Sequence, residues 1–231
     1  MKRYLQFLLF LLPVFFTINA KADDIWIPFG QNLVNPPIWK YKGGATNLDA
    51  AAWKTLGYTE TGWVSGGSAL GFGTGTPARN TAIPENASAG GGGVSGSRYP
   101  TMYFRKVINI PDLSVYVNFL LRTKFDDGIV VWINGTQAYI NNIAAAPSYS
   151  TLATSAITNN GADIFSATIS NSLFVTGDNI IAVEIHQSAL NSSDLFFDLE
   201  LTGVNISQPA DVLFFPFGQN LGGAPVSQFK G

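Results

Sequence analysis

Hydrophobic and polar residues largely alternate over residues 115–125, in the sequence VYVNFLLRTKF. A period of two places successive side chains on opposite faces of a strand, so that one face is buried and the other meets water. The same pattern resumes over residues 129–133 and again over residues 136–140. The middle of the chain therefore predicts three consecutive strands.

Two short breaks separate these strands, and both carry turn residues. Asn134-Gly135 favours a type I′ hairpin turn, because both central residues of that turn need positive φ. Asp126-Asp127-Gly128 also has the composition of a tight turn. With a turn at each break, the segment predicts a three-stranded antiparallel meander.

Alternation recurs over residues 103–110, 180–186 and 195–202, and a single capped turn is expected at Ser170–Leu173. In the last strand Leu195, Phe197 and Leu199 share one face, and Asp198 lies on the other. Strands with one buried and one wet face are typical of two packed sheets. The predicted fold class is all-β, an antiparallel β-sandwich.

Composition narrows the range of functions. Only 12% of the residues are charged and the formal net charge is -2, so the chain lacks the basic field that nucleic acid or anionic lipid requires. Cysteine is absent, so stability must come from the core without disulfides. The Gly-rich run Gly71–Gly75 lacks the spacing of a nucleotide-binding loop, and we expect no cofactor.

The N-terminus has the layout of a secretory signal peptide. Lys2 and Arg3 precede the apolar run Leu5–Phe16, and small residues surround Ala22. The apolar run is shorter than the roughly 20 residues of a membrane-spanning helix. We therefore expect cleavage after Ala22, no membrane span after cleavage, and a secreted or cell-surface protein.

A repeat organises the chain. Pro216–Leu221 repeats Pro28–Leu33 identically, and at the same offset Pro225, Lys230 and Gly231 match Pro37, Lys42 and Gly43. After the predicted signal peptide at 1–22, the repeat predicts one domain at 23–208 and a linker with the start of a second copy at 209–231. About 20 residues cannot form an independent sheet domain, so we expect a longer protein with further domains downstream.

Several motifs, taken in order, resemble a known family. They are Gly62-Trp63, Leu70–Gly73, Phe125–Gly128, Val131–Gly135, Gly177–Gln187 and Ser193–Leu201. The series is similar to the galactose-binding-domain-like jelly rolls that accompany catalytic domains in secreted bacterial proteins. The hairpin and the following Gly-x-Asn-x-Ile-Ala-Val-Glu are also similar to the sugar-binding domain of family 2 glycoside hydrolases. The resemblance implies a jelly-roll topology and a carbohydrate ligand.

Two groups of acidic or basic residues could carry chemistry. Asp126 and Asp127 could act as paired carboxylates, although adjacent strand residues face opposite ways and the pair also suits a turn. His186, the only histidine, shares a strand face with Glu184 and precedes Gln187. These three could hold a ligand at the strand end or simply pair with one another.

Two further sets of residues suggest ligands. Trp132 is expected on the exposed face of its strand beside Tyr139 across the hairpin, where the two rings could stack on a sugar. Asp194 and Asp198 could supply oxygens for a structural calcium ion. A typical zinc site is excluded, because one histidine without cysteines cannot build it.

No nucleophile–base constellation such as Gly-x-Ser-x-Gly or His-Glu-x-x-His occurs. The leading hypothesis is therefore a non-catalytic secreted binding module, with carbohydrate as the ligand, at the N-terminus of a tandem-repeat protein. One alternative is the ancillary domain of a secreted metallophosphoesterase or glycosidase whose catalytic domain lies downstream. The other is a structural or adhesion spacer of a surface protein.

Overall fold

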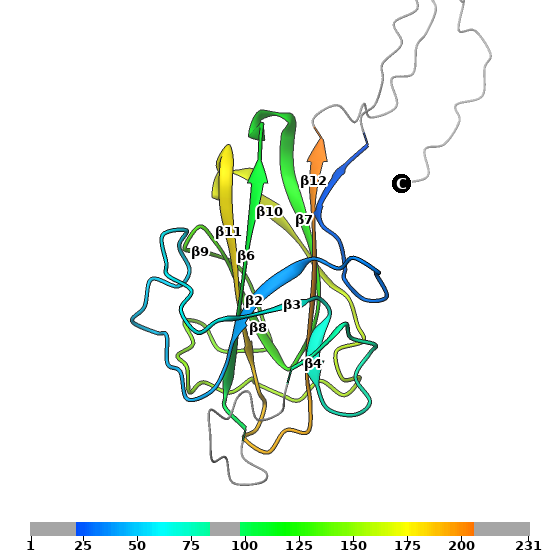
Figure 1. Cartoon of the computed structure of the whole chain (residues 1–231), viewed down its shortest axis with the longest axis vertical. Coiled ribbons are helices and arrows are strands. Elements are labelled where there is room, and N and C mark those ends of the chain that lie inside the picture. Colours follow the sequence, from blue (N-terminus) through cyan, green and yellow to red (C-terminus); the bar gives the residue numbers. More distant parts are fainter. Residues whose placement is uncertain (1–21, 84–97, 206–231) are drawn as a thin grey trace, which may run out of the picture. The chain divides into compact units, whose positions relative to one another are not determined.

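Two mostly antiparallel sheets lie face to face in the computed structural model, which describes residues 22–83 and 98–205 (Figure 1). Sheet A runs in the order β10 (Phe165–Ser170), β7 (Tyr116–Asp126), β12 (Leu195–Asn205), β4 (Leu70–Phe72) and β5 (Thr81–Ala82), with β1 (Asp24–Ile27) also on β12. Sheet B runs in the order β3 (Val64–Gly67), β2 (Ile38–Lys42), β6 (Thr101–Ile110), β11 (Gly177–His186), β8 (Gly128–Ile133) and β9 (Thr136–Asn141).

The predicted all-β sandwich is confirmed, as are the individual strands of residues 103–110, 180–186 and 195–202. Helical structure in the described residues is confined to the 3₁₀ turns η1 (Leu113–Val115) and η2 (Asn171–Leu173). The expected cap at Ser170 is present, since its side chain accepts a hydrogen bond from the Ser172 amide. Within residues 22–83 and 98–205, no helix is long and apolar enough to cross a membrane.

The predicted signal segment up to residue 21 and the second copy of the repeat lie outside the described residues. The first copy is described, and it provides β1, β2 and the turn between them. Its contacts are considered below.

The hairpin between β8 and β9 forms as predicted, with φ of 50° at Asn134 and 87° at Gly135. The predicted meander is wrong, however, because β7 belongs to sheet A and β8 to sheet B. Asp127 explains the crossing between the sheets. Its two carboxylate oxygens accept the amides of Ile157 and Ser188, each at 2.8 Å, so the segment is tied to two connecting loops instead of closing a hairpin.

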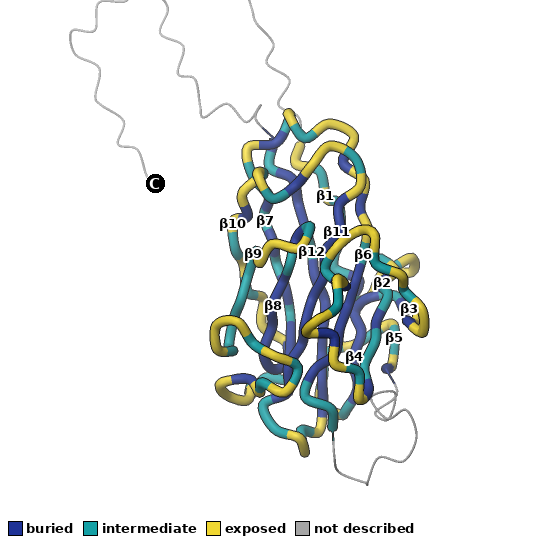
Figure 2. Tube along the Cα trace, turned by 90° about the vertical axis from the view of Figure 1, so that its left-hand side faces the viewer, coloured by how far each residue is buried: buried dark blue, intermediate teal, exposed yellow. Residues whose placement is uncertain are grey.

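The main core fills the space between the two sheets, where dark-blue buried segments run through both layers (Figure 2). Its centre is aromatic. The ring of Phe197 lies 4.5 Å from that of Phe104 and 5.0 Å from that of Trp39, measured between centroids. Each such ring contributes about 1.5–3 kcal/mol by leaving water, so this core can hold the fold without disulfides.

Candidate functional site

A second, smaller cluster of hydrophobic side chains covers the outer face of sheet B, which we call the covered face. Side chains that alternate with the core residues of β6, β8 and β11 point there and pack beneath loop residues of segments 48–63 and 149–151. Three of the sequence-predicted site residues, Trp132, Glu184 and His186, lie on this face. The structure therefore brings these three together.

His186 is fully buried, and every contact of its ring is internal. Its Nδ1 atom lies 2.8 Å from the carbonyl oxygen of Thr151 and 3.0 Å from the Thr101 hydroxyl. The Thr101 hydroxyl donates to the carbonyl of Tyr149, so Nδ1 must be the donor in both of its own contacts. Its Nε2 atom faces Glu184 at 3.4 Å.

Glu184 is bound on its other side by Lys54, whose ammonium lies 3.3 Å from Oε1. The carboxylate is thus shared between an ammonium and an imidazole, and only 4% of the residue is exposed. A general acid or base must reach a substrate proton within hydrogen-bond distance. Because Glu184 and His186 are enclosed, the geometry supports structural pairing between them.

Trp132 does not form the expected open platform with Tyr139. A bulge between Val131 and Trp132 places Tyr139 opposite Val131, and Tyr139 packs against the main core instead. The Lys54 ammonium lies 3.6 Å from the centroid of the Trp132 ring, a cation–π contact that covers one face of the indole. Sequence reasoning missed Lys54, because it comes from a loop with no recognisable motif.

Asp126 lies at the end of β7, and its residue is 2% exposed. Burial, followed by hydrogen bonding to Asp127 and the negative charges of Asp127 and Asp194, raises the pKa of Asp126 to about 9. Burial also raises the pKa of Asp194. Asp126 is therefore a neutral carboxylic acid at pH 7, and its Oδ1 atom has no hydrogen-bond partner among the described residues.

Gln187 follows β11, and its side chain is also enclosed. Its Oε1 atom is buried without a partner within the described part of the chain, while its backbone binds Pro100 and Ala153. Within the described residues, the side chains of Gln187 and Asp126 form no hydrogen bond with Glu184 or His186, so the predicted site residues do not form one constellation.

Asp198 has a different role from the expected calcium ligand. Its Oδ1 accepts the amides of Gly30 and Leu199, and its Oδ2 accepts the amide of Gln31, all at 3.0 Å. Asp194, the other expected ligand, accepts a hydrogen bond from the Ser193 hydroxyl at 3.2 Å and lies near the carboxyl groups of Asp126 and Asp127. Across residues 22–83 and 98–205, no group of three acidic, histidine or cysteine side chains is arranged to hold a metal ion.

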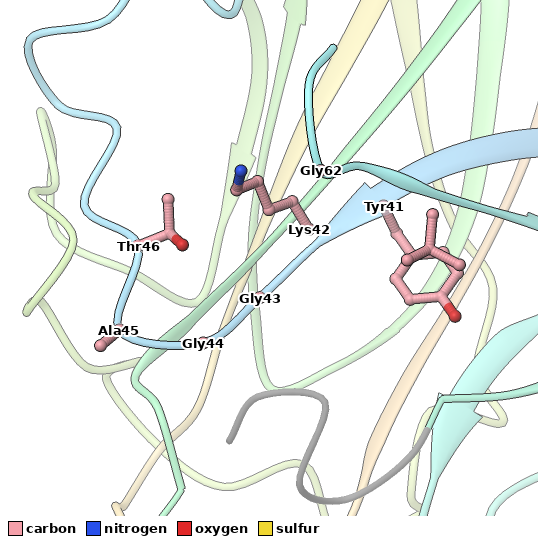
Figure 3. A pocket seen from close by; sticks show the side chains of 8 residues that line it. Tyr41, Lys42, Gly43, Gly44, Ala45, Thr46 and Gly62 are labelled. Carbon is pink, nitrogen blue, oxygen red and sulfur yellow. The ribbon is translucent and has the colours of Figure 1, made fainter. Parts of the chain in front are cut away.

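An open hollow lies elsewhere, at the end of β2. It has a volume of about 320 Å³ and is lined by Tyr41, Lys42, Gly43, Gly44, Ala45, Thr46, Gly62 and Val64. Figure 3 shows the Lys42 and Thr46 side chains on the same side of the Gly43–Gly44 backbone, with the Tyr41 ring set apart from them.

The walls of this hollow are fixed by hydrogen bonds from side chains to backbone carbonyls. Lys42 donates from Nζ to the Thr61 carbonyl at 3.1 Å, and Tyr149 donates from its hydroxyl to the Gly44 carbonyl at 3.0 Å. Gly62 adopts a φ of +74°, and a Cβ there would lie 3.4 Å from the Lys42 ammonium. The hollow therefore offers an ammonium, a hydroxyl and bare backbone to a small polar ligand. The Gly43-Gly44 pair after an aromatic strand was the sequence signal for it.

No protein-family model matches the chain, and no curated protein matches it either. Among solved structures it is similar to parts of β-glucuronidases. The Ruminococcus gnavus enzyme has a TM-score of 0.46 at 8% identity, over 82% of this chain and 30% of that one. An uncultured Clostridium enzyme has 0.44 at 10% identity, over 83% and 31%. Bacteroides uniformis β-glucuronidase 2 has 0.45 at 16% identity, over 74% and 17%. The chain thus spans less than a third of the length of each.

Proposed function

We propose that this chain is a non-catalytic module that binds carbohydrate in the hollow at the end of β2. The observation that carries the proposal is the lining of the hollow, which combines Lys42, Thr46 and the bare backbone of three glycines. Such groups form hydrogen bonds with sugar hydroxyls, and the volume of about 320 Å³ lies at the lower end of the range for small-molecule sites. A single sugar residue or chain end suits this size.

A non-catalytic role is supported by the enclosure and the internal partners of the acidic and basic side chains. Glu184 and His186 are enclosed and bound to each other, and Asp127 is occupied by two backbone amides. None of these groups faces the hollow, whose lining contains no carboxylate. The site is therefore suited to holding a ligand rather than to transferring a proton to it.

The wider setting is part of the proposal. We infer export through the N-terminal signal and a jelly-roll topology, as the resemblance implies, and a role as the first of two or more tandem units. Repetition would raise avidity for a polymeric glycan, because linked sites bind at high effective concentration. Expression of the natural gene, followed by N-terminal sequencing of the exported protein, checks the cleavage after Ala22.

The ligand is tested with the purified chain on a glycan array, followed by titration of each bound glycan. Lys42→Met removes the ammonium, and Lys40→Met, on the same strand but outside the hollow, is the matched control. We expect Lys42→Met to weaken binding by about 10- to 100-fold, since hydrogen bonds to charged groups are worth about 1.5–3 kcal/mol. Binding that Lys42→Met leaves unchanged would place the site elsewhere, and an array without any binding would contradict the carbohydrate ligand.

A further inference from the structure

The hollow at the end of β2 carries a positive charge that no acidic side chain of the described residues pairs with. The Lys42 ammonium forms one hydrogen bond, to the Thr61 carbonyl at 3.1 Å. An ammonium has three N–H donors, so two remain for water or a ligand. Glu60, which precedes Thr61, is held by Arg105 at 2.9 Å instead. The charge of Lys42 is therefore available to an anion that enters the hollow.

The backbone beside this ammonium adds further donors. Within residues 22–83 and 98–205, the amides of Gly43, Gly44, Ala45 and Thr46 donate no hydrogen bond. Gly44 is nevertheless a buried residue, and buried backbone N–H groups in proteins are normally paired. An acceptor bound in the hollow would supply the missing partner for this segment.

The backbone conformation at Gly44 suits an anion in particular. Its φ is +85°, whereas neither Gly43 nor Ala45 has a positive φ. Such a change of hand makes successive N–H groups converge, and the resulting concavities bind anions. The Gly44 carbonyl accepts the Tyr149 hydroxyl at 3.0 Å. Because the N–H of a trans peptide points opposite to its carbonyl, the Ala45 amide points away from Tyr149.

We propose that the hollow recognises an oxyanion substituent on the sugar, a carboxylate or a sulfate ester, and so selects acidic glycans over neutral ones. This inference rests on the proposed function, since it specifies the ligand of the same hollow. The Lys42 and Thr46 side chains lie on the same side of the Gly43–Gly44 backbone (Figure 3), and no carboxylate lines the hollow. Hydrogen bonds between charged partners are roughly twice as strong as neutral ones, so an oxyanion gains more here than a sugar hydroxyl.

Sugars that differ only at carbon 6 test this selectivity. The probes are methyl galactoside, the corresponding methyl galacturonide and methyl galactoside 6-sulfate, together with the same forms of glucose. Binding to the purified full chain is measured by NMR titration. We expect an acidic form to bind at least about tenfold more tightly than the neutral form of the same sugar. The tighter of the carboxylate and the sulfate identifies the substituent.

Three variants assign the selectivity to the charge of Lys42. Lys42→Met should bring the affinities for acidic and neutral forms to within about twofold, because only the acidic form loses a charged partner. Lys42→Arg keeps the charge and should keep the preference. Lys40→Met, outside the hollow on the same strand, should also keep it. In the wild type, salt should weaken the binding of the acidic form alone, because it screens the attraction between charges.

The possible failures are distinguishable. Equal affinities for neutral and acidic forms, or binding to neutral glycans alone, would overturn the selectivity and leave the carbohydrate function standing. A preference that persists in Lys42→Met, or that Lys42→Arg loses to the same extent, would also overturn it. If neither these probes nor the glycan array shows binding, the carbohydrate function itself fails, and this inference fails with it.

Discussion

Asp198, in the middle of β12, accepts the amide of Gly30, which lies 168 positions earlier, at 3.0 Å. Its second oxygen accepts the amide of Gln31 at the same distance, and the carboxylate is fully buried. One side chain of sheet A therefore accepts two backbone amides of the turn that connects β1 to β2. The sequence of this turn is the one that recurs at Pro216–Leu221. The sequence suggested Asp198 as a calcium ligand. In the structure its carboxylate is a hydrogen-bond acceptor for backbone N–H groups.

Asp198→Asn should lower the free energy of unfolding by about 1–3 kcal/mol, because the amide nitrogen places a donor against a buried backbone donor. Urea unfolding followed by tryptophan fluorescence measures the change. Glu200→Gln is the matched control on the same strand. Its partner Arg122 is more than a third exposed, so we expect a loss below about 1 kcal/mol. Equal losses in the two variants would contradict the role of Asp198.

The stability of the fold should fall as pH rises, owing to Asp126. Its pKa is raised to about 9 in the folded chain from 3.8, so folding requires the protonated form. The stabilisation is complete below the unfolded pKa and is lost as pH rises through the folded pKa. Between these limits the free energy of unfolding falls by about 1.4 kcal/mol per pH unit, because folding takes up one proton. Asp194 contributes with the same sign.

Asp126→Asn removes this titration while keeping the shape of the side chain. We expect the variant to be less dependent on pH between 5 and 9, and to be more stable than the wild type at pH 8. Thermal unfolding across this pH range measures both effects. Asp163→Asn, at an exposed position, should leave the wild-type pH profile unchanged. A variant at position 126 with the wild-type profile would rule out a buried neutral acid there.

Lys54 and Glu184 should be energetically coupled, because the Lys54 ammonium lies 3.3 Å from the Glu184 carboxylate. Glu184→Gln should destabilise the fold by about 3 kcal/mol, because it leaves Lys54 without its partner on a largely enclosed surface. Lys54→Met should cost less, since the aliphatic stem still covers Trp132. Thermal unfolding of both single variants and the double variant gives the coupling energy, and strict additivity would contradict a shared network.

The hairpin turn between β8 and β9 provides a test of backbone conformation alone. Gly135 has a φ of +87°, and a Cβ there would lie 3.6 Å from Thr55 Cγ2, an ordinary contact, so Gly135→Ala should cost about 1–2 kcal/mol through the left-handed conformation itself. Gly57→Ala is the matched control, because Gly57 has nothing within 4 Å and no positive φ. We expect that control to be neutral or slightly stabilising. Chemical denaturation resolves the difference.

The sequence predicted those features that depend on local chemistry. Alternation identified the strands, and Asn134-Gly135 identified its turn, because backbone conformation at positive φ is decided by the residues themselves. Asp126-Asp127-Gly128 had the composition of a turn as well, yet Asp127 binds two distant loops and directs the chain to the other sheet. Nothing in the local sequence distinguishes these two uses of an aspartate.

The candidate site was harder to predict for the same reason. The bulge after Val131 moves Tyr139 to the face opposite Trp132, and Lys54 arrives on Trp132 from a loop about 80 positions earlier in the chain. The hollow at the end of β2 is lined largely by backbone, which leaves no side-chain motif to recognise. The ligand roles assigned to Trp132, Tyr139, Gln187 and the other candidate residues remain predictions.

The first and last strands lie side by side and antiparallel, with Ala22 and Asp23 bonded to Asn205. A force applied to both ends of this unit would act across that pair and break its hydrogen bonds one after another, rather than shearing the whole ladder at once. Such a unit has low mechanical stability. Linked to domains that unfold at higher force, it would unfold first and lengthen the chain under load.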